Sequence, residues 1–154
     1  AVREYESAAI SKKDIEEIID CARFAPTARN EQPWIFVAVS NKDILNKVSE
    51  ITSPNGTFIK GASWGIFVFC RDTKYYLEDG SSATVYILLA SWAKNIGSCW
   101  IAGDKKPYCE NIRRLLKVPQ DYRLVSIVAL GYAQNIPSKE KKSLEGILFW
   151  EEYR

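Results

Sequence analysis

The stretch Ala83-Thr84-Val85-Tyr86-Ile87-Leu88-Leu89-Ala90 decides how this chain folds. It lies in a helix expected over about residues 81–95, and no face of it carries a charge, whereas a surface helix normally has a polar side. A helix that is apolar all round must be buried all round, either inside the domain or beneath a second chain. We favour a partner subunit, because small domains rarely enclose a whole helix.

Helices and strands alternate on both sides of this segment. Ser11 is expected to cap a helix through Arg23, with Asp14 at the capping-box position. The tail after Gly131 is polar and then aromatic, and such a tail needs something to pack on, for which a second chain is a natural candidate. The alternation is typical of helices on both faces of a mixed sheet. Further helices are expected near 43–51 and 110–117, and strands at 34–39, 65–70, 99–102 and 124–130.

Composition excludes several classes of function. The length of 154 residues predicts one domain, residues 1–154, and 21 basic against 19 acidic side chains make nucleic acid a poor default partner. The chain contains no histidine, which excludes Ser-His-Asp and Cys-His nucleophiles, histidine zinc sites and every histidine general base. Its chemistry must therefore use other side chains or a bound cofactor.

The cysteines and the apolar stretches indicate a compartment. None of Cys21, Cys70, Cys99 and Cys109 forms a Cys-x-x-Cys pair, so a zinc ribbon or thioredoxin motif is excluded. Their apolar or helical contexts favour buried free thiols in a reducing compartment. The longest uncharged stretch, 80–93, is too short to span a bilayer, and no amino-terminal signal pattern is present. We expect a cytoplasmic protein with no membrane partner.

The loop 25–34, Ala-Pro-Thr-Ala-Arg-Asn-Glu-Gln-Pro-Trp, concentrates hydrogen-bonding side chains between two prolines. A stiff loop of this kind can grip a flat polar heterocycle along its edge. The alternative is an ordinary connection from helix to strand with an asparagine turn.

Other segments offer weaker signals. Gly97 and Gly103 bracket a short strand, where glycine allows a ligand to approach the backbone closely, or where two turns simply flank an edge strand. The cluster 139–142, Lys-Glu-Lys-Lys, is either a phosphate clamp or a solvated surface run. Asn55 is typical of a turn residue, and the acids at 78 and 79 are typical of the amino-terminal charge of the apolar helix. No Gly-x-Gly-x-x-Gly or Walker A sequence occurs.

Together these segments resemble the FMN-dependent nitroreductase family over nearly the whole chain, 2–153. The landmarks are the opening 2–5, Val-Arg-Glu-Tyr, the loop 25–34, Asp79-Gly80 before the apolar helix, the segment 97–103 and the tail Lys-x-Lys-Lys-x-Leu-Glu. The Pro-x-x-x-Asn-x-Gln-Pro-Trp element is the most specific of them, and the shared order and spacing strengthen the match.

The resemblance implies an α+β fold, a three-layer α/β/α sandwich with a mixed sheet, and an intertwined homodimer with FMN in two interfacial sites. The apolar helix would form the dimer core and the aromatic tail would embrace the other subunit. NADH or NADPH would reduce the flavin, which would pass electrons by a ping-pong mechanism to a nitroaromatic, a quinone or a similar acceptor. Chemistry on the flavin requires no catalytic side chain and no metal. By motif position, the cofactor-binding residues would be Arg3, Pro26, Thr27, Ala28, Asn30, Gln32, Asn55, Ala102, Gly103, Lys139 and Lys141, those of the loop from the opposite subunit.

The sequence also departs from the family pattern. The family's usual phosphate-gripping arginine before the Val-Arg pair is either absent or lies upstream of this sequence. Ala102 replaces a glutamate found in some members, and Lys141 stands where arginine is common. Lysine cannot make the bidentate phosphate pair that arginine makes. These departures leave open an alternative function, a flavin-binding protein without turnover that serves storage or sensing.

Overall fold

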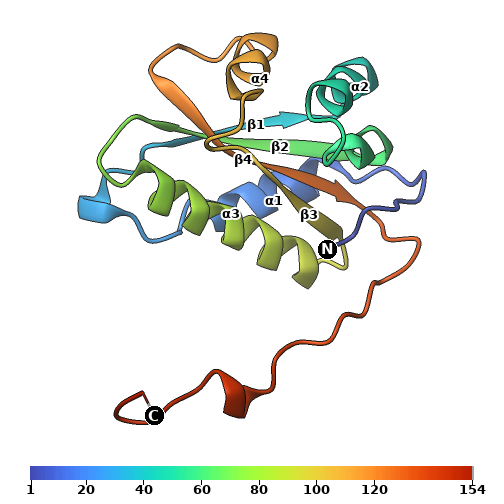
Figure 1. The fold of residues 1–154 in the computed structure, drawn as a ribbon. Coiled ribbons are helices and arrows are strands. Elements are labelled where there is room, and N and C mark those ends of the chain that lie inside the picture. The colour runs from blue at the N-terminus through green and yellow to red at the C-terminus, as the bar shows by residue number, and fades with distance from the viewer. Residues whose placement is uncertain (154) are drawn as a thin grey trace.

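The computed structural model describes residues 1–153, in which four strands form a single sheet in the order β1-β2-β4-β3 (Figure 1). All three neighbouring pairs of strands are antiparallel, so the expected mixed sheet is wrong. The reason lies in β4: β2 and β3, joined by α3, point the same way, but β4 lies between them and is antiparallel to both. The strands are β1 (Trp34–Val39), β2 (Trp64–Arg71), β3 (Gly97–Ala102) and β4 (Tyr122–Gly131).

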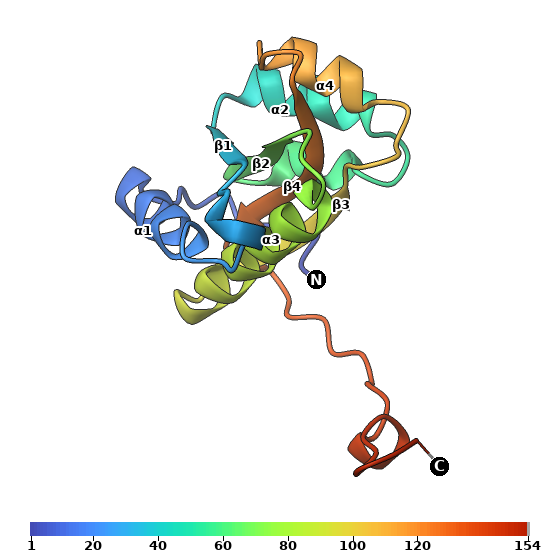
Figure 2. The same cartoon turned by 90° about the vertical axis from the view of Figure 1, so that its left-hand side faces the viewer.

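Helices cover both faces of the sheet, as Figures 1 and 2 show, with α1 and α3 on one face and α2 and α4 on the other. The chain has two hydrophobic cores, one on each face of the sheet. Alternate residues of β2 belong to different cores, because successive side chains of a strand point to opposite faces. Phe67 and Phe69 pack towards α2 and α4, whereas Ile66 and Val68 pack towards α1 and α3. The helices are α1 (Lys12–Ala22), α2 (Lys42–Ile51), α3 (Tyr76–Ala93) and α4 (Cys109–Leu115), with short 3₁₀ turns η1 (Ala28–Asn30), η2 (Thr57–Gly61) and η3 (Leu144–Gly146).

The local signals of the sequence explain where these elements begin. The Ser11 hydroxyl accepts from the backbone N–H of Asp14, which confirms the predicted cap. The helix expected from residue 81 instead begins at Tyr76 and runs through Gly80. A glycine inside a helix usually costs stability, but here an added Cβ would stand 2.7 Å from a methyl group of Val125. The missing side chain therefore lets α3 lie directly on the sheet.

Helix α3 is not enclosed by its own chain. Its inner face is buried against the sheet through Ala83, Thr84 and Ile87, but its outer face is open. Leu89 is 64% exposed and Trp92 is 60% exposed, and Val85 and Tyr86 lie on the same open side. The interpretation of α3 as a central core helix is therefore wrong, and cover by a second chain stays a prediction.

The cysteines and the tail lie partly where the sequence predicts them. All four thiols are free, but only Cys70 and Cys99 are buried, because Cys21 lies on the outward face of α1 and Cys109 is half-buried at the start of α4. The expectation of buried thiols is thus wrong for Cys21. Tyr132 still packs against the core and Gln134 is bonded to Glu4, but after these residues the chain leaves the body (Figure 2). The side chains of Phe149, Trp150 and Tyr153 on this tail are exposed. No helix within 1–153 is long and apolar enough to cross a membrane.

Candidate functional site

Three of the predicted cofactor residues meet in one cavity of about 210 Å³. Arg3 comes from the amino-terminal segment, Asn55 from the turn after α2, and Ala102 from the end of β3. The backbone holds the first of these in place: the N–H of Val2 donates to the Ser98 carbonyl at 2.9 Å, so residues 1–3 run beside β3. The cavity is lined by Arg3, Thr52, Ser53, Asn55, Phe58, Trp100, Ile101, Ala102, Lys106 and Tyr108, and we call it the Arg3 pocket.

The lining of the Arg3 pocket favours an anionic, flat ligand. It contains two cations, Arg3 and Lys106, and three aromatic side chains, but none of its ten residues is a carboxylate. The Arg3 guanidinium carbon lies 5.5 Å from the centre of the Phe58 ring, within cation–π range. Asn55 adds an amide that can both donate and accept hydrogen bonds.

The backbone of β3 presents donors at the edge of this pocket. β3 is an edge strand, and in an antiparallel sheet alternate residues direct both backbone groups to the same side. Because the Ser98 carbonyl is used by Val2 on the outer side, the N–H and C=O of Ala102 also face outwards. The Ala102 N–H is thereby aimed at the open edge rather than at β4.

Side chains of the loop after β3 hold the peptide groups of Ala102 and Gly103 in place. The Tyr108 hydroxyl donates to the Ala102 carbonyl, and the Cys109 thiol donates to the Gly103 carbonyl at 2.7 Å. Burial raises the pKa of both Tyr108 and Cys109, so both stay protonated as donors. The Asp104 carboxylate accepts from Tyr76 at 2.7 Å and ties the same loop to α3.

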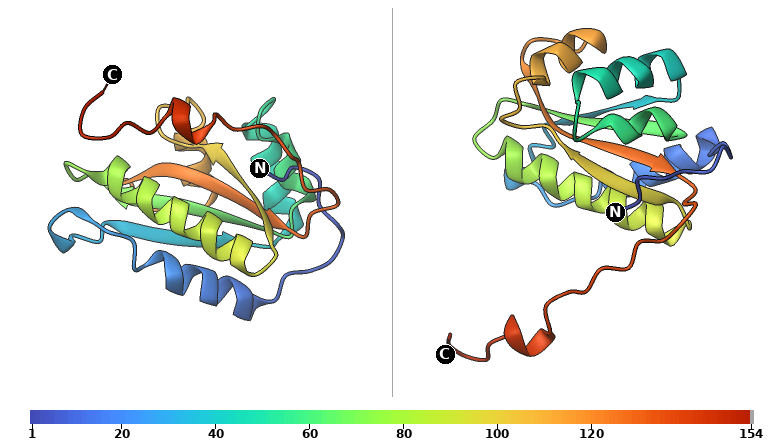
Figure 3. Two further views of the ribbon diagram at one scale, coloured as in Figure 1. Left: turned by 90° about the horizontal axis from the view of Figure 1, so that it is seen from below. Right: turned by 45° about the vertical axis from the view of Figure 1, so that its right-hand side comes forward.

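The remaining predicted residues lie elsewhere in this chain. Pro26, Thr27, Ala28, Asn30 and Gln32 gather in the loop before β1, which lies at the opposite end of the sheet from the amino terminus in Figures 1 and 3. One chain therefore does not bring this loop to the Arg3 pocket.

The two predicted phosphate ligands, Lys139 and Lys141, are exposed on the tail. The start of the tail is close to the Arg3 pocket, since Pro137 and Arg3 line a second hollow of about 280 Å³. Neither lysine lines that hollow or the Arg3 pocket.

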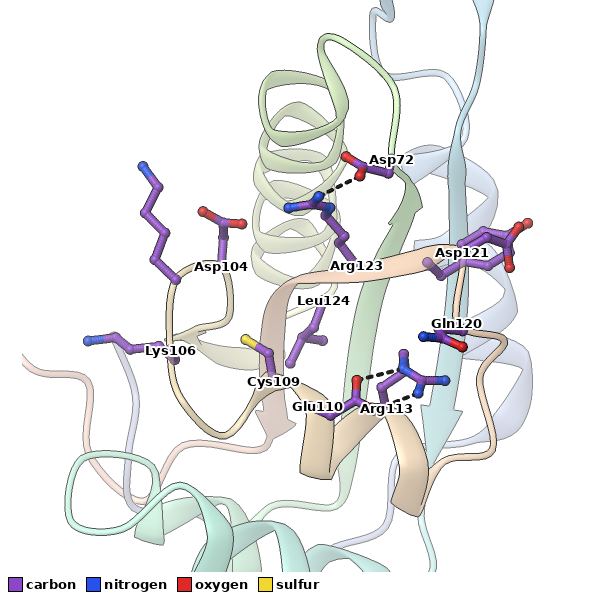
Figure 4. Close-up of a pocket in the computed structure, with 12 residues that line it drawn as sticks. Asp72, Asp104, Lys106, Cys109, Glu110, Arg113, Gln120, Asp121, Arg123 and Leu124 are labelled. Carbon is purple, nitrogen blue, oxygen red and sulfur yellow. Dashed lines mark hydrogen bonds and ion pairs between the residues drawn. The ribbon is translucent and has the colours of Figure 1, made fainter.

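A larger polar cavity of about 430 Å³ lies on the other side of the 103–109 loop, beside α4 (Figure 4). It holds none of the predicted cofactor residues, and its charges are largely used within the chain. Arg113 pairs with Glu110 at 2.6 Å, and Arg123 pairs with Asp72. Lys106 is the residue that lines both this cavity and the Arg3 pocket.

Residues 1–63, which include Arg3, the loop and Asn55, match the sequence profile of the nitroreductase family. An Archaeoglobus fulgidus protein, provisionally named NADH dehydrogenase/NAD(P)H nitroreductase, is 37% identical over 153 residues, covering 94% of this chain and 84% of its own. The chain belongs to the nitroreductase family.

A second relative and a solved structure support the membership of this chain in the nitroreductase family. A Methanothermobacter thermautotrophicus protein of the same provisional name is 31% identical over 143 residues, covering 89% of this chain and 74% of its own. The solved structure of an FMN-dependent nitroreductase from Clostridium difficile R20291 superimposes with a TM-score of 0.92 at 26% identity, covering 99% of this chain and 95% of that one. The α+β fold is therefore that of the nitroreductases.

Both glycines of the nitroreductase segment 97–103 lie against other parts of the chain. A Cβ on Gly103 would stand 2.5 Å from the carbonyl oxygen of Val125, and one on Gly97 would stand 2.9 Å from a methyl group of Val2. Both glycines thus make room for neighbouring parts of their own chain. Gly103 is buried and does not line the Arg3 pocket, so its predicted role towards the cofactor stays a prediction.

The sequence reasoning missed Lys106 and Tyr108 among the pocket residues, and it missed the contact of Asp79 with the loop. Lys106 and Tyr108 carry no sequence signal, because lysine and tyrosine in a short loop resemble any surface residues. Asp79 carried a signal that was interpreted only in part: it does lie in the first turn of α3, but its carboxylate reaches back to the loop, to Thr27 and Ala28.

Proposed function

We propose that this protein is an FMN-dependent NAD(P)H oxidoreductase that works as a homodimer. The observation that carries the proposal is the donor-rich, aromatic and carboxylate-free lining of the Arg3 pocket. When bound, FMN would supply hydride acceptance from NADH or NADPH and ping-pong delivery of electrons to a nitroaromatic, quinone or similar acceptor. The structurally similar Clostridium difficile protein is described as FMN-dependent, which supports this choice of cofactor.

The residues of the pocket would bind and orient the cofactor. Asn55 and the Ala102 N–H would donate hydrogen bonds to the polar edge of the ring, and donors fixed in advance stabilise charge that develops there during reduction. The Tyr108 and Cys109 donors would hold the 102–103 peptide groups in position. Arg3 would neutralise negative charge on the cofactor. Lys139 and Lys141 would hold the phosphate as point charges, without the bidentate geometry of arginine.

A second copy of the chain would complete the site. The amino-terminal segment that carries Arg3 and the loop 26–32 lie at opposite ends of the sheet, as Figures 1 and 3 show. Helix α3 exposes an apolar face of Val85, Tyr86, Leu89 and Trp92. Pairing two copies through this face would cover it and bring the loop of one chain to the pocket of the other. The exposed aromatic tail would then pack on the partner subunit.

The test is the visible absorption spectrum of the purified protein after addition of FMN and removal of free flavin. We expect a retained flavin band that bleaches when NADH or NADPH is added without oxygen. A retained band that neither nucleotide bleaches would instead support the flavin-binding protein without turnover. A protein that retains no flavin would contradict the proposal.

A matched pair of variants assigns the binding to the Arg3 pocket. Asn55→Ala removes hydrogen bonds worth about 0.5–1.5 kcal/mol, so FMN should bind several-fold more weakly. Asn111→Ala removes the same group from the exposed surface of α4 and should leave FMN affinity unchanged. Equal affinities of the two variants would place the flavin elsewhere.

A further inference from the structure

A buried carboxylate fastens the loop 27–32 to the start of α3. Asp79 is only 4% exposed, and both of its oxygens are used by the loop. One accepts from the backbone N–H of Ala28 at 2.9 Å, and the other accepts from the Thr27 hydroxyl at 3.0 Å. The Thr27 oxygen in turn accepts from the backbone N–H of Gln32 at 3.1 Å, so the chain of bonds spans the loop.

The conformation that these bonds hold is an unfavourable one. Arg29, Asn30 and Gln32 have positive φ angles of 54°, 57° and 47°. Asparagine tolerates this left-handed region, but arginine and glutamine rarely adopt it, because their Cβ crowds the backbone there. A strained backbone persists only where its surroundings fix it, and such segments concentrate at ligand clamps.

Burial of its own side chains does not offset the unfavourable backbone conformation of the loop. None of the η1 residues is buried, and Asn30, Glu31 and Gln32 are exposed. The polar end of Gln32 is already turned towards Asn30, where its amide donates to the Asn30 side chain at 3.0 Å. The bonds to Asp79 thus shape a surface that this chain does not use for its own core.

We infer that Asp79 is a positioning residue for the cofactor: it holds the loop 27–32 in the strained shape in which Asn30 and Gln32 reach the flavin in the site of the partner subunit. The inference rests on the proposed function. It also assigns a reason to Gly80, whose missing side chain lets the first turn of α3 press on Val125 and Cys70. That close approach places the neighbouring Asp79 carboxylate beneath the loop.

The test compares Asp79→Asn with Glu78→Gln. Asparagine keeps the size of Asp79 but has one acceptor oxygen and no charge. It can accept from the Ala28 N–H only by turning its NH2 group towards the Thr27 oxygen, which reverses that bond and removes the charge that strengthens both contacts. Glu78 lies in the same helical turn and is exposed, so Glu78→Gln removes the same charge from the end of α3 without touching the loop. We expect Asp79→Asn to weaken FMN binding about 10- to 100-fold and Glu78→Gln to leave it unchanged.

Two readouts besides activity separate positioning from a loss of fold. Amide hydrogen exchange of the FMN-free protein should accelerate at Ala28 and Gln32 in Asp79→Asn, while the β2 and β4 amides stay protected. The absorption band of flavin bound to the variant should shift towards that of free flavin. If Asp79→Asn does not fold, Thr27→Val, which keeps the carboxylate bond to Ala28, carries the same test with a smaller expected loss.

The possible outcomes separate the inference from the proposed function. Unchanged FMN affinity in Asp79→Asn, with wild type binding normally, overturns the inference while leaving the proposed function intact. Equal losses in Asp79→Asn and Glu78→Gln overturn it as well, because they assign the effect to the charge at the helix terminus. A wild-type protein that binds no FMN contradicts the proposed function, and the cofactor role of Asp79 falls with it.

Discussion

Replacing Leu89 with alanine tests whether the open face of α3 is an interface between two copies. The side chain of Leu89 is 64% exposed in one chain. Burying a whole leucine side chain is worth about 1.5–3 kcal/mol, so covering the exposed part contributes about 1–2 kcal/mol per chain. A two-fold symmetric dimer loses this twice, about 2–4 kcal/mol, which raises its dissociation constant about 30- to 700-fold.

The dissociation constant would be measured by sedimentation velocity over a range of protein concentrations. As a matched comparison, Ile87→Ala removes a fully buried side chain from the inner face of the same helix and should lower the free energy of unfolding by about 2–5 kcal/mol. Alanine is a good helix former, so Leu89→Ala should leave the fold of each subunit intact. Identical dissociation constants for wild type and Leu89→Ala would refute the reasoning.

Three further predictions concern acid stability, thiol reactivity and the packing of α3. Hydrogen bonding to Arg113 lowers the pKa of Glu110 from 4.5 to about 2, so its stabilising contribution is complete at neutral pH and is lost as pH falls through that range. Glu110→Gln should remove that part of the acid unfolding curve measured by circular dichroism, and an unchanged curve would argue against the pairing. In thiol labelling followed by mass spectrometry, exposed Cys21 should react first. Cys70 should stay unmodified until the protein unfolds, because burial raises its pKa to about 12; early labelling there would contradict its burial. Gly80→Ala would bring a Cβ within 2.9 Å of the Cys70 sulfur and should cost about 1–3 kcal/mol of stability in thermal unfolding, whereas an unchanged melting temperature would show that α3 has room to move.

Local signals predicted most elements of the fold, because they depend on neighbours in the sequence. The 34–39 strand was placed at its observed bounds, and the Ser11 cap follows from one hydroxyl three residues before an acid. The strand order could not be predicted in this way. The position of β4 between β2 and β3 is a long-range pairing, and the helix–strand alternation of the sequence is equally compatible with a mixed sheet.

Only those site residues that lie in motifs of the family could be predicted from the sequence. The resemblance led to Arg3, Asn55 and Ala102, which the fold brings into one pocket. It gave no indication of Asp79 as the anchor of the loop, because 51 positions separate that carboxylate from Ala28. The sequence left two interpretations open for the glycines near β3, ligand approach and flanking turns, because it does not reveal that Val125 and Val2 lie against them.

The central claim is that each flavin site takes Arg3 from one chain and the loop 26–32 from the other, and mixed dimers test it most directly. Arg3→Ala and Asn30→Ala would be made separately and then co-expressed with two different affinity tags, so that dimers containing one chain of each kind can be isolated. Each variant alone should bind FMN weakly at both sites. In the mixed dimer one site would carry both defects and the other neither, so we predict one FMN bound per dimer with wild-type affinity. A mixed dimer that binds FMN no better than the two parent variants would contradict the shared site.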